Sequence, residues 1–221
     1  MKFYPVFLRV AGRRCVVVGG GEVAERKARS LLAAGARVTL VSPAVTAGLT
    51  ELAADGEIAH VARPYQSGDL AGALLAYAAT DDEALHATIA AEAEAAGVLL
   101  NVVDRPRWCG FIVPSVLSRG DLTVAVSTGG GSPALARRVR EDIEEQLGPE
   151  YERALAVLAA LRRHLQDQAL SSAERQRILS GLVASDLLNC LREPDRVAVD
   201  RLLAEHAGTA VSLASLGADL R

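Results

Sequence analysis

Short apolar runs alternate with longer stretches of helical spacing over the first hundred residues. The runs are rich in valine, leucine and alanine and have the length of buried strands. They cover residues 14–18, 36–41, 57–61, 74–80 and 98–103. Helical patterns lie between them at about 22–34, 45–54 and 82–96. This alternation predicts an α/β fold with a parallel sheet covered by helices on both faces.

The pattern changes near residue 110. Residues 111–117 and 122–127 are β-rich and flank the turn at 119–121, which indicates a hairpin. Ser132-Pro133 then predicts the start of a helix that runs to about Leu147. From about residue 150 onward only helical patterns follow. We therefore predict three regions, which are a nucleotide-binding domain at 1–110, a hairpin and helix at 111–148, and a small helical domain at 149–221.

A glycine-rich motif follows the first expected strand. Residues 19–24, GGGEVA, match the pattern G-x-G-x-x-G/A between a buried strand and a helix. In a Rossmann-type domain Gly19 permits the tight turn and Gly21 lets a pyrophosphate approach the backbone. The free N–H groups at the start of the helix would bind its charge. The motif predicts a dinucleotide site; the alternative is a tight glycine turn without a ligand.

The second expected strand lacks the acidic residue that usually binds the adenosine ribose. Its end reads Ser42-Pro43-Ala44, so we expect Ser42 or the backbone of Pro43 and Ala44 to take that role. No arginine follows at once to hold a 2′-phosphate. From these residues alone, NAD and NADP stay equally open.

Polar residues also end the later strands, at the sheet edge where open parallel sheets bind ligands. Thr80 and Asn101 are therefore candidate cofactor contacts, while Asp82 is better explained as a helix cap. Asp104 follows the last strand and would lie near the nicotinamide end, where a carboxylate can move protons. Its alternative role is to cap a turn before Pro106.

A second glycine-rich loop, STGGGSP at 127–133, leads from a strand into a helix and is a candidate anion site. Together with nearby arginines it suits a ligand that carries several carboxylates. The residues expected to bind it are Arg105, Ser127, Thr128, Gly129, Ser132 and Arg137. Arg138 and Arg140 are better explained as a solvated helix face that pairs with nearby acidic residues.

Composition narrows the class of protein. The net charge of −3 gives no field that favours nucleic acid. Cys15, Cys109 and Cys190 lie far apart, and no cysteine or histidine spacing indicates a metal site or a disulfide framework, which fits a reducing cytoplasm. No apolar run approaches the ~20 residues of a membrane-spanning helix, and the first residues do not read as a signal peptide.

Four blocks in fixed order carry a family resemblance. They are VVVGGGEVAERKARSLLAAGARVTLVSP, AATDD, NVVDRPRWCGFIVPS and VAVSTGGGSPALAR. Together they resemble the precorrin-2 dehydrogenase module of siroheme synthases, closely over residues 1–147 and more loosely in the helical tail. Such modules are often fused to a methyltransferase that makes precorrin-2; we expect another protein to supply that activity here.

The resemblance implies NAD-dependent oxidation of precorrin-2 to sirohydrochlorin, and in some members the insertion of ferrous iron to give siroheme. It implies a homodimer formed through residues 111–147, and it matches the family's key aspartate to Asp104. The cofactor loop maps to Gly21, Glu22 and Val23, and the adenosine contacts to Pro43 and Ala44. The missing acidic residue is then a family feature, and NAD becomes the expected cofactor.

Two other functions are compatible with a Rossmann-type domain. One is a non-catalytic module that senses NAD(H) and contacts a protein through its helical part, but such a module needs neither the NVVD nor the STGGGSP block. The other is a different small-molecule NAD(P) oxidoreductase, which would usually place a histidine or lysine acid–base in the crevice.

We expect the tetrapyrrole to lie across the sheet edge, between the nucleotide-binding domain and the dimer region.

Overall fold

The structure is a computed structural model that describes residues 2–220. Within this range the chain divides after Val113 into two compact units. The first is an α/β unit and the second consists of a hairpin followed by helices. The predicted division into three regions at 110 and 148 stays a prediction.

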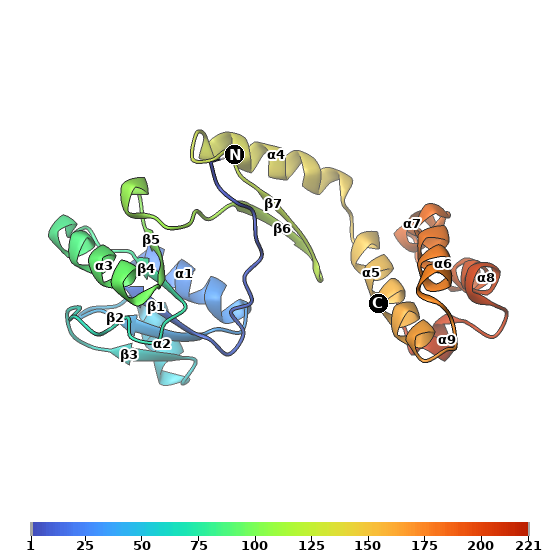
Figure 1. The fold of residues 1–221 in the computed structure, drawn as a ribbon, viewed down its shortest axis with the longest axis horizontal. Helices are drawn as coiled ribbons and strands as arrows, with labels where there is room; N and C mark the ends of the chain where they lie inside the picture. Colours follow the sequence, from blue (N-terminus) through green and yellow to red (C-terminus); the bar gives the residue numbers. More distant parts are fainter. Residues whose placement is uncertain (1, 221) are drawn as a thin grey trace. The chain divides into compact units, whose positions relative to one another are not determined.

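The first unit contains a five-stranded, wholly parallel sheet, as the sequence predicts (Figure 1). Its strands are β1 (Arg14–Val18), β2 (Arg37–Val41), β3 (Ile58–Val61), β4 (Leu75–Ala78) and β5 (Leu99–Val102). Their order in the sheet is β3-β2-β1-β4-β5. The chain order reverses where β1 lies between β2 and β4. In open sheets of this kind the ligand crevice lies at that point, beyond the carboxyl ends of the strands.

Helices cover both faces of this sheet, which explains why its strands read as continuous apolar runs. On one face, α1 (Glu22–Ala33) and α2 (Ala47–Ala54) pack against side chains that include Val17 and Leu40. On the other face, α3 (Glu83–Ala96) packs Ile89 and Ala93 against the alternate residues of the strands. Val16 and Val17, on opposite faces of β1, are fully buried.

The connection from β3 to β4, residues 62–74, contains no helix although every residue in it is described. Side chains hold it in place instead. Arg63 donates two hydrogen bonds to the Asp69 carboxylate, at 2.8 and 2.7 Å. The Tyr65 hydroxyl donates to Glu92 of α3 at 2.6 Å. This network holds an irregular segment that leads from β3 at one edge of the sheet to β4, which lies between β1 and β5.

In the second unit β6 (Ser115–Arg119) and β7 (Leu122–Val126) form the predicted antiparallel hairpin. The hairpin begins later than the sequence predicts, because Phe111 packs against Tyr77 in the first unit and Pro114 has no N–H for a ladder. The helix α4 (Pro133–Gln146) follows with Ser132 as its N-cap, as predicted. A one-turn helix, η1 (Pro106–Trp108), after β5 was not predicted.

The remainder of the second unit is helical. Its helices are α5 (Glu150–Gln166), α6 (Ser172–Ala184), α7 (Leu187–Arg192), α8 (Arg196–Ala207) and α9 (Leu213–Leu216). Their core is built mainly of leucines, among them Leu161, Leu165 and Leu203. As predicted, residues 150–220 contain no strand. Across residues 2–220, no helix has the length and apolar character needed to cross a membrane.

Candidate cofactor and active site

The three glycines after β1 serve two different purposes. Gly19 has φ +116°, and a Cβ there would lie 2.1 Å from the carbonyl oxygen of Ala79. A Cβ on Gly20 would lie 1.9 Å from the carbonyl oxygen of Ala44. At Gly21, by contrast, a Cβ would meet no atom of residues 2–220 within 4 Å. The first two glycines therefore permit close backbone packing, whereas the third leaves open space in front of the helix.

The N-terminus of α1 is uncapped. Gly21 is its N-cap residue, and no side chain among the described residues caps this end with a hydrogen bond. The other α-helices described in this unit are capped, α2 by Thr46 and α3 by Asp82. Glu22 and Val23 begin α1, so their backbone N–H groups can bind an anionic ligand such as a pyrophosphate. The expectation that Asp82 is a helix cap is confirmed.

The loop after β2 is held by hydrogen bonds within itself and from β3. Ser42 is buried and its hydroxyl donates to the carbonyl oxygen of Ala44 at 2.7 Å. His60 donates from Nε2 to the carbonyl oxygen of Ser42 at 2.9 Å. The Ser42 proton is therefore used inside the loop, while Pro43 and Ala44 are exposed. Of the three residues predicted to contact adenosine, these two present the accessible surface.

The end of β4 is held by a histidine that the sequence did not single out. His86 of α3 is 1% exposed and its Nε2 donates to the carbonyl oxygen of Thr80 at 2.8 Å. The Thr80 hydroxyl accepts from the N–H of Asp82 at 3.4 Å. The loop that would border the cofactor is thus fixed by α3. A histidine one turn into a helix after a strand end is the only signal that the sequence offers for this contact.

Asp104 follows β5 with φ +57°, and no other described residue apart from glycine has a positive φ. Aspartate tolerates this left-handed conformation better than most residues do. The side chain is exposed, and its carboxylate has no hydrogen bond or ion pair within residues 2–220. It does not cap the turn before Pro106. A free carboxylate at the carboxyl edge of the sheet is available to a ligand.

Asn101 and Cys109 fix the loop that carries Asp104. The Asn101 amide donates to the carbonyl oxygen of Phe111 at 2.9 Å. The Cys109 Sγ accepts from the N–H of Val102 at 3.3 Å, and burial raises the pKa of this thiol. Cys109 is therefore a structural thiol rather than a nucleophile. The sequence shows it only as an isolated cysteine.

The glycine-rich loop after β7 uses its hydroxyl groups internally. Thr128 Oγ1 accepts from the N–H of Ser132 and donates to the carbonyl oxygen of the same residue, at 3.0 and 2.9 Å. Ser127 Oγ accepts from the N–H of Gly129 at 3.1 Å. Ser132 Oγ accepts from the N–H of Leu135 and so caps α4. These contacts shape the loop, and its role in substrate binding stays a prediction.

The arginines of α4 all pair with acidic residues of their own helix. Arg137 donates from Nε to Glu141 at 3.0 Å, and this hydrogen bond lowers the pKa of that carboxyl. Arg138 pairs with Asp142 at 2.7 Å, and Arg140 pairs with its neighbours Glu141 and Glu144. The expected pairing with nearby acidic residues is confirmed for both Arg138 and Arg140. Only Arg138 lies on a solvated face, because the side chain of Arg140 is 19% exposed. The predicted substrate contact of Arg137 would require its guanidinium to share or leave Glu141.

The predicted residues fall into two groups. The first unit holds Gly19, Gly21, Glu22, Val23, Ser42, Pro43, Ala44, Thr80, Asn101, Asp104 and Arg105. Most of them lie at or just beyond the carboxyl ends of β1, β2, β4 and β5. The second unit holds Ser127, Thr128, Gly129, Ser132 and Arg137. Candidate cofactor binding and proton transfer therefore belong to the first unit.

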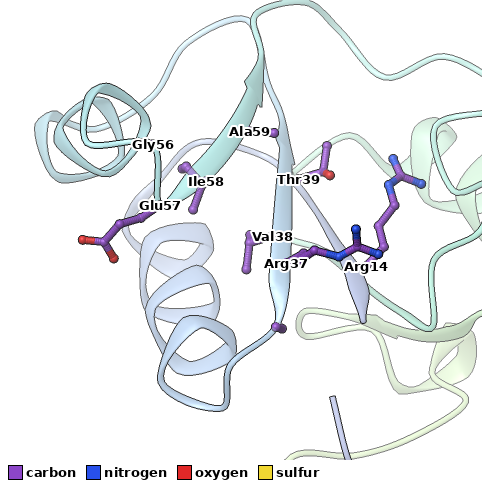
Figure 2. A pocket seen from close by; sticks show the side chains of 9 residues that line it. Arg14, Arg37, Val38, Thr39, Gly56, Glu57, Ile58 and Ala59 are labelled. Atoms are coloured by element: carbon purple, nitrogen blue, oxygen red, sulfur yellow. The ribbon is translucent and has the colours of Figure 1, made fainter. Parts of the chain in front are cut away.

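A groove of about 400 Å³ lies elsewhere on the same sheet (Figure 2). Arg14, Arg37, Glu57 and Ile58 line it, among others, at the first residues of β1, β2 and β3. Those are the amino ends of the strands, opposite the edge where open parallel sheets bind ligands. Within residues 2–220 there is also no group of three or more His, Cys, Asp or Glu side chains able to hold a metal ion. The carboxyl edge remains the candidate active site.

Comparison with known proteins also indicates a nucleotide-binding site in the first unit. Residues 6–115 match the family model "Putative NAD(P)-binding", and residues 119–146 match "Sirohaem biosynthesis protein central". The siroheme synthase of Methylobacillus flagellatus is 40% identical over 208 residues, which cover 92% of this chain and 44% of that protein. The chain belongs to the siroheme synthase family. Siroheme synthase 1 of Aeromonas salmonicida is also 40% identical, over 99% of this chain and 48% of its own length.

The chain spans about half the length of the siroheme synthases that it matches. A solved structure covers nearly all of it. SirC, a precorrin-2 dehydrogenase, superimposes with a TM-score of 0.75 at 25% identity, over 93% of this chain and 99% of SirC. This family member therefore shares its overall fold with a protein of similar length.

Proposed function

We propose that this protein oxidises precorrin-2 to sirohydrochlorin with NAD⁺ as the electron acceptor. One observation carries the proposal. The uncapped N-terminus of α1 and the unpaired carboxylate of Asp104 both lie at the carboxyl edge of one parallel sheet. The first fits a dinucleotide phosphate and the second fits a proton acceptor. The similarity to SirC, a precorrin-2 dehydrogenase, supports the choice of substrate.

The residues of the first unit fit NAD. Open space in front of Gly21 allows a pyrophosphate to reach the N–H groups of Glu22 and Val23. Pro43 and Ala44 are exposed at the end of β2, where the adenosine ribose lies in this fold. Arg63 follows β3, and both terminal nitrogens of its guanidinium group donate hydrogen bonds to the Asp69 carboxylate. This arginine is therefore not available to hold a 2′-phosphate. This favours NAD over NADP.

The oxidation removes one hydride and one proton from precorrin-2. When bound, NAD⁺ supplies the acceptor for the hydride. Asp104 takes the proton on a carboxylate oxygen, directly or through one water, and later releases it to solvent. The αL backbone at Asp104, with Asn101 holding the following segment, fixes the point at which that side chain leaves the backbone. Holding donor and acceptor in place supplies much of the rate of such a transfer.

The carboxylates of the tetrapyrrole need cationic and N–H partners. Arg105 is exposed next to Asp104, and within residues 2–220 its side chain donates a hydrogen bond only to the carbonyl oxygen of Asp104, at 3.2 Å. In the second unit we assign the same role to Ser127, Thr128, Gly129, Ser132 and Arg137. Gly129 has φ +64°, which turns its loop sharply before α4. An arginine fork binds a carboxylate more specifically than a lysine does.

Three further features belong to the proposal. A homodimer would cover apolar side chains that the second unit exposes, including Val116 and Leu135. Ferrous iron would be a second substrate, with Asp104 as the base that takes protons from the pyrrole nitrogens. The three free cysteines, Cys15, Cys109 and Cys190, suit a reducing cytoplasm.

Anaerobic absorbance spectroscopy tests the proposal. The purified chain is mixed with enzymatically made precorrin-2 and NAD⁺, and parallel samples contain NADP⁺ or no cofactor. We expect sirohydrochlorin and NADH to form in equal amounts, with slower turnover on NADP⁺. Ferrous iron is then added to test for siroheme. Binding of NAD⁺ without turnover of precorrin-2 would contradict the dehydrogenase and favour a cofactor-sensing module.

A further inference from the structure

Lys27 is an unusual residue in this chain. Lysine and arginine together number 24, yet only positions 2 and 27 are lysine. Lys27 lies on α1 beside Ala24 and Ala28, which are fully buried. Its Nζ lies 5.1 Å from the centre of the Tyr77 ring on β4. The ammonium group is thus directed along the sheet face rather than outward into solvent.

No acidic side chain neutralises Lys27. Among the residues that the structure describes, none forms an ion pair with it. Glu25, the nearest acidic residue in sequence, is bound to Arg29 and Thr46 instead. Burial, together with the charge of Arg26, lowers the pKa of Lys27. A half-buried ammonium group without a counterion is costly, and an anionic ligand would offset that cost.

The surroundings of Tyr77 define a small site. The rings of Phe111 and Tyr77 form a T-shaped pair with centroids 5.6 Å apart. Asn101 on β5 is the residue paired with Tyr77 in the parallel sheet. Burial raises the pKa of Tyr77 to about 12, so its phenol stays neutral and gives Lys27 no counter-charge. Helix α3 packs on the opposite face of β4 and β5. The face that carries Lys27 is covered here by the segment around Phe111.

The position of this site relates it to the reaction. Lys27 lies five residues after Glu22, which corresponds to a rise of about 7.5 Å along α1 from its uncapped end. Tyr77 is the penultimate residue of β4, and Asp104 follows the end of the adjacent strand β5. Lys27 therefore lies close to the carboxyl ends of the strands, on the face of the sheet that α1 covers. The glycine loop and the end of β5 border this region.

We propose that Lys27, seated over the Tyr77 ring, binds one carboxylate side chain of the tetrapyrrole substrate and so positions the macrocycle against Asp104. The role rests on the proposed dehydrogenase function. It is a binding role: the ammonium group donates to the carboxylate and takes no proton from the reacting carbon. The ring of Tyr77 lies under the ammonium group and holds the lysine chain in one direction.

The test compares Lys27→Met with Arg26→Met, an exposed position on the same helix. Steady-state kinetics with precorrin-2, NAD⁺ affinity and melting temperature are measured for both variants and for the unchanged protein. For Lys27→Met we expect KM for precorrin-2 to rise roughly tenfold or more, as for loss of one charge-assisted hydrogen bond. NAD⁺ affinity should not change, and Arg26→Met should behave as the unchanged protein does.

Lys27→Arg keeps the charge and should restore most of the affinity for precorrin-2. If Lys27→Met does not fold, Lys27→Gln provides the same comparison. A lower melting temperature with unchanged KM would make Lys27 a structural residue and overturn the inference. Inactivity of the unchanged protein would instead refute the dehydrogenase function, and this inference with it, so the two failures are distinguishable.

Discussion

The side-chain amide of Asn101 donates a hydrogen bond of 2.9 Å to the backbone carbonyl of Phe111, ten residues further along the chain. It closes the loop that contains Asp104 and η1. Cys109 adds a second closure, because its sulfur contacts the backbone of Val102. The loop that carries the proposed proton acceptor is therefore fixed at both ends within the first unit.

Asn101→Ala removes this closure. We expect stability to fall by about 1 kcal/mol, the usual cost of one lost internal hydrogen bond. Turnover should fall more than NAD⁺ affinity, since the change frees the Asp104 loop. Urea unfolding and steady-state kinetics measure both effects, with Asn189→Ala in the second unit as the control. A loss confined to NAD⁺ affinity would instead assign Asn101 to the cofactor, as the sequence predicts.

Gly19 and Gly21 should respond differently to alanine. Gly19→Ala places a Cβ against the Ala79 carbonyl at a positive φ, so we expect a loss of more than about 2 kcal/mol in stability. Gly21→Ala meets no protein atom and should leave the melting temperature unchanged. It should nevertheless weaken NAD⁺ binding, because the methyl group occupies the space of the pyrophosphate. Equal NAD⁺ affinity in Gly21→Ala would place the cofactor elsewhere.

Asp69 predicts a pH dependence of stability. Hydrogen bonds from Arg63 lower the pKa of its carboxyl below the ordinary value of 3.8. A lowered folded-state pKa gives stability that is present above the unfolded-state value and lost as the pH falls through the folded-state value. Asp69→Asn should therefore destabilise the protein at neutral pH, and the difference should disappear in acid below that range. Thermal unfolding across pH measures this; a constant difference would point to packing instead.

Arg137 and Arg138 form a matched pair on α4. Both are exposed and both bind an acidic residue four positions later. Of these two arginines, the sequence assigns substrate binding only to Arg137. We expect Arg137→Gln to raise KM for precorrin-2 several-fold while Arg138→Gln leaves it unchanged, since exposed ion pairs themselves contribute only about 0.2–1 kcal/mol. Equal KM values in the two variants would remove Arg137 from the substrate site.

Most of the fold follows from periodicity. The strands of the sheet, the helices between them and the Ser132 cap all lie within a few residues of their predicted bounds. These features are local, because they depend on apolar spacing and on side chains that bond to their own backbone. The late start of β6 was not predictable in this way, since it depends on the long-range contact between Phe111 and Tyr77.

The candidate site was only partly predictable. The glycine motif predicted where the N-terminus of α1 lies. The ends of the expected strands indicated Thr80 and Asp104 as candidate site residues. The sequence could not show that Ser42 donates its proton within its own loop, or that buried His86 holds Thr80. Such contacts join residues through folding of the backbone rather than through spacing. The positive φ of Asp104 is likewise a property of the folded loop.

A single-turnover comparison of the unchanged protein with Asp104→Asn tests the proposed role of Asp104. Asparagine tolerates the αL backbone, so folding and NAD⁺ affinity should be preserved. Without the carboxylate we expect formation of NADH from precorrin-2 to slow by about 10²–10⁴-fold, the range for loss of a general base. Formation of NADH at the rate of the unchanged protein would contradict the assignment of Asp104 as the proton acceptor.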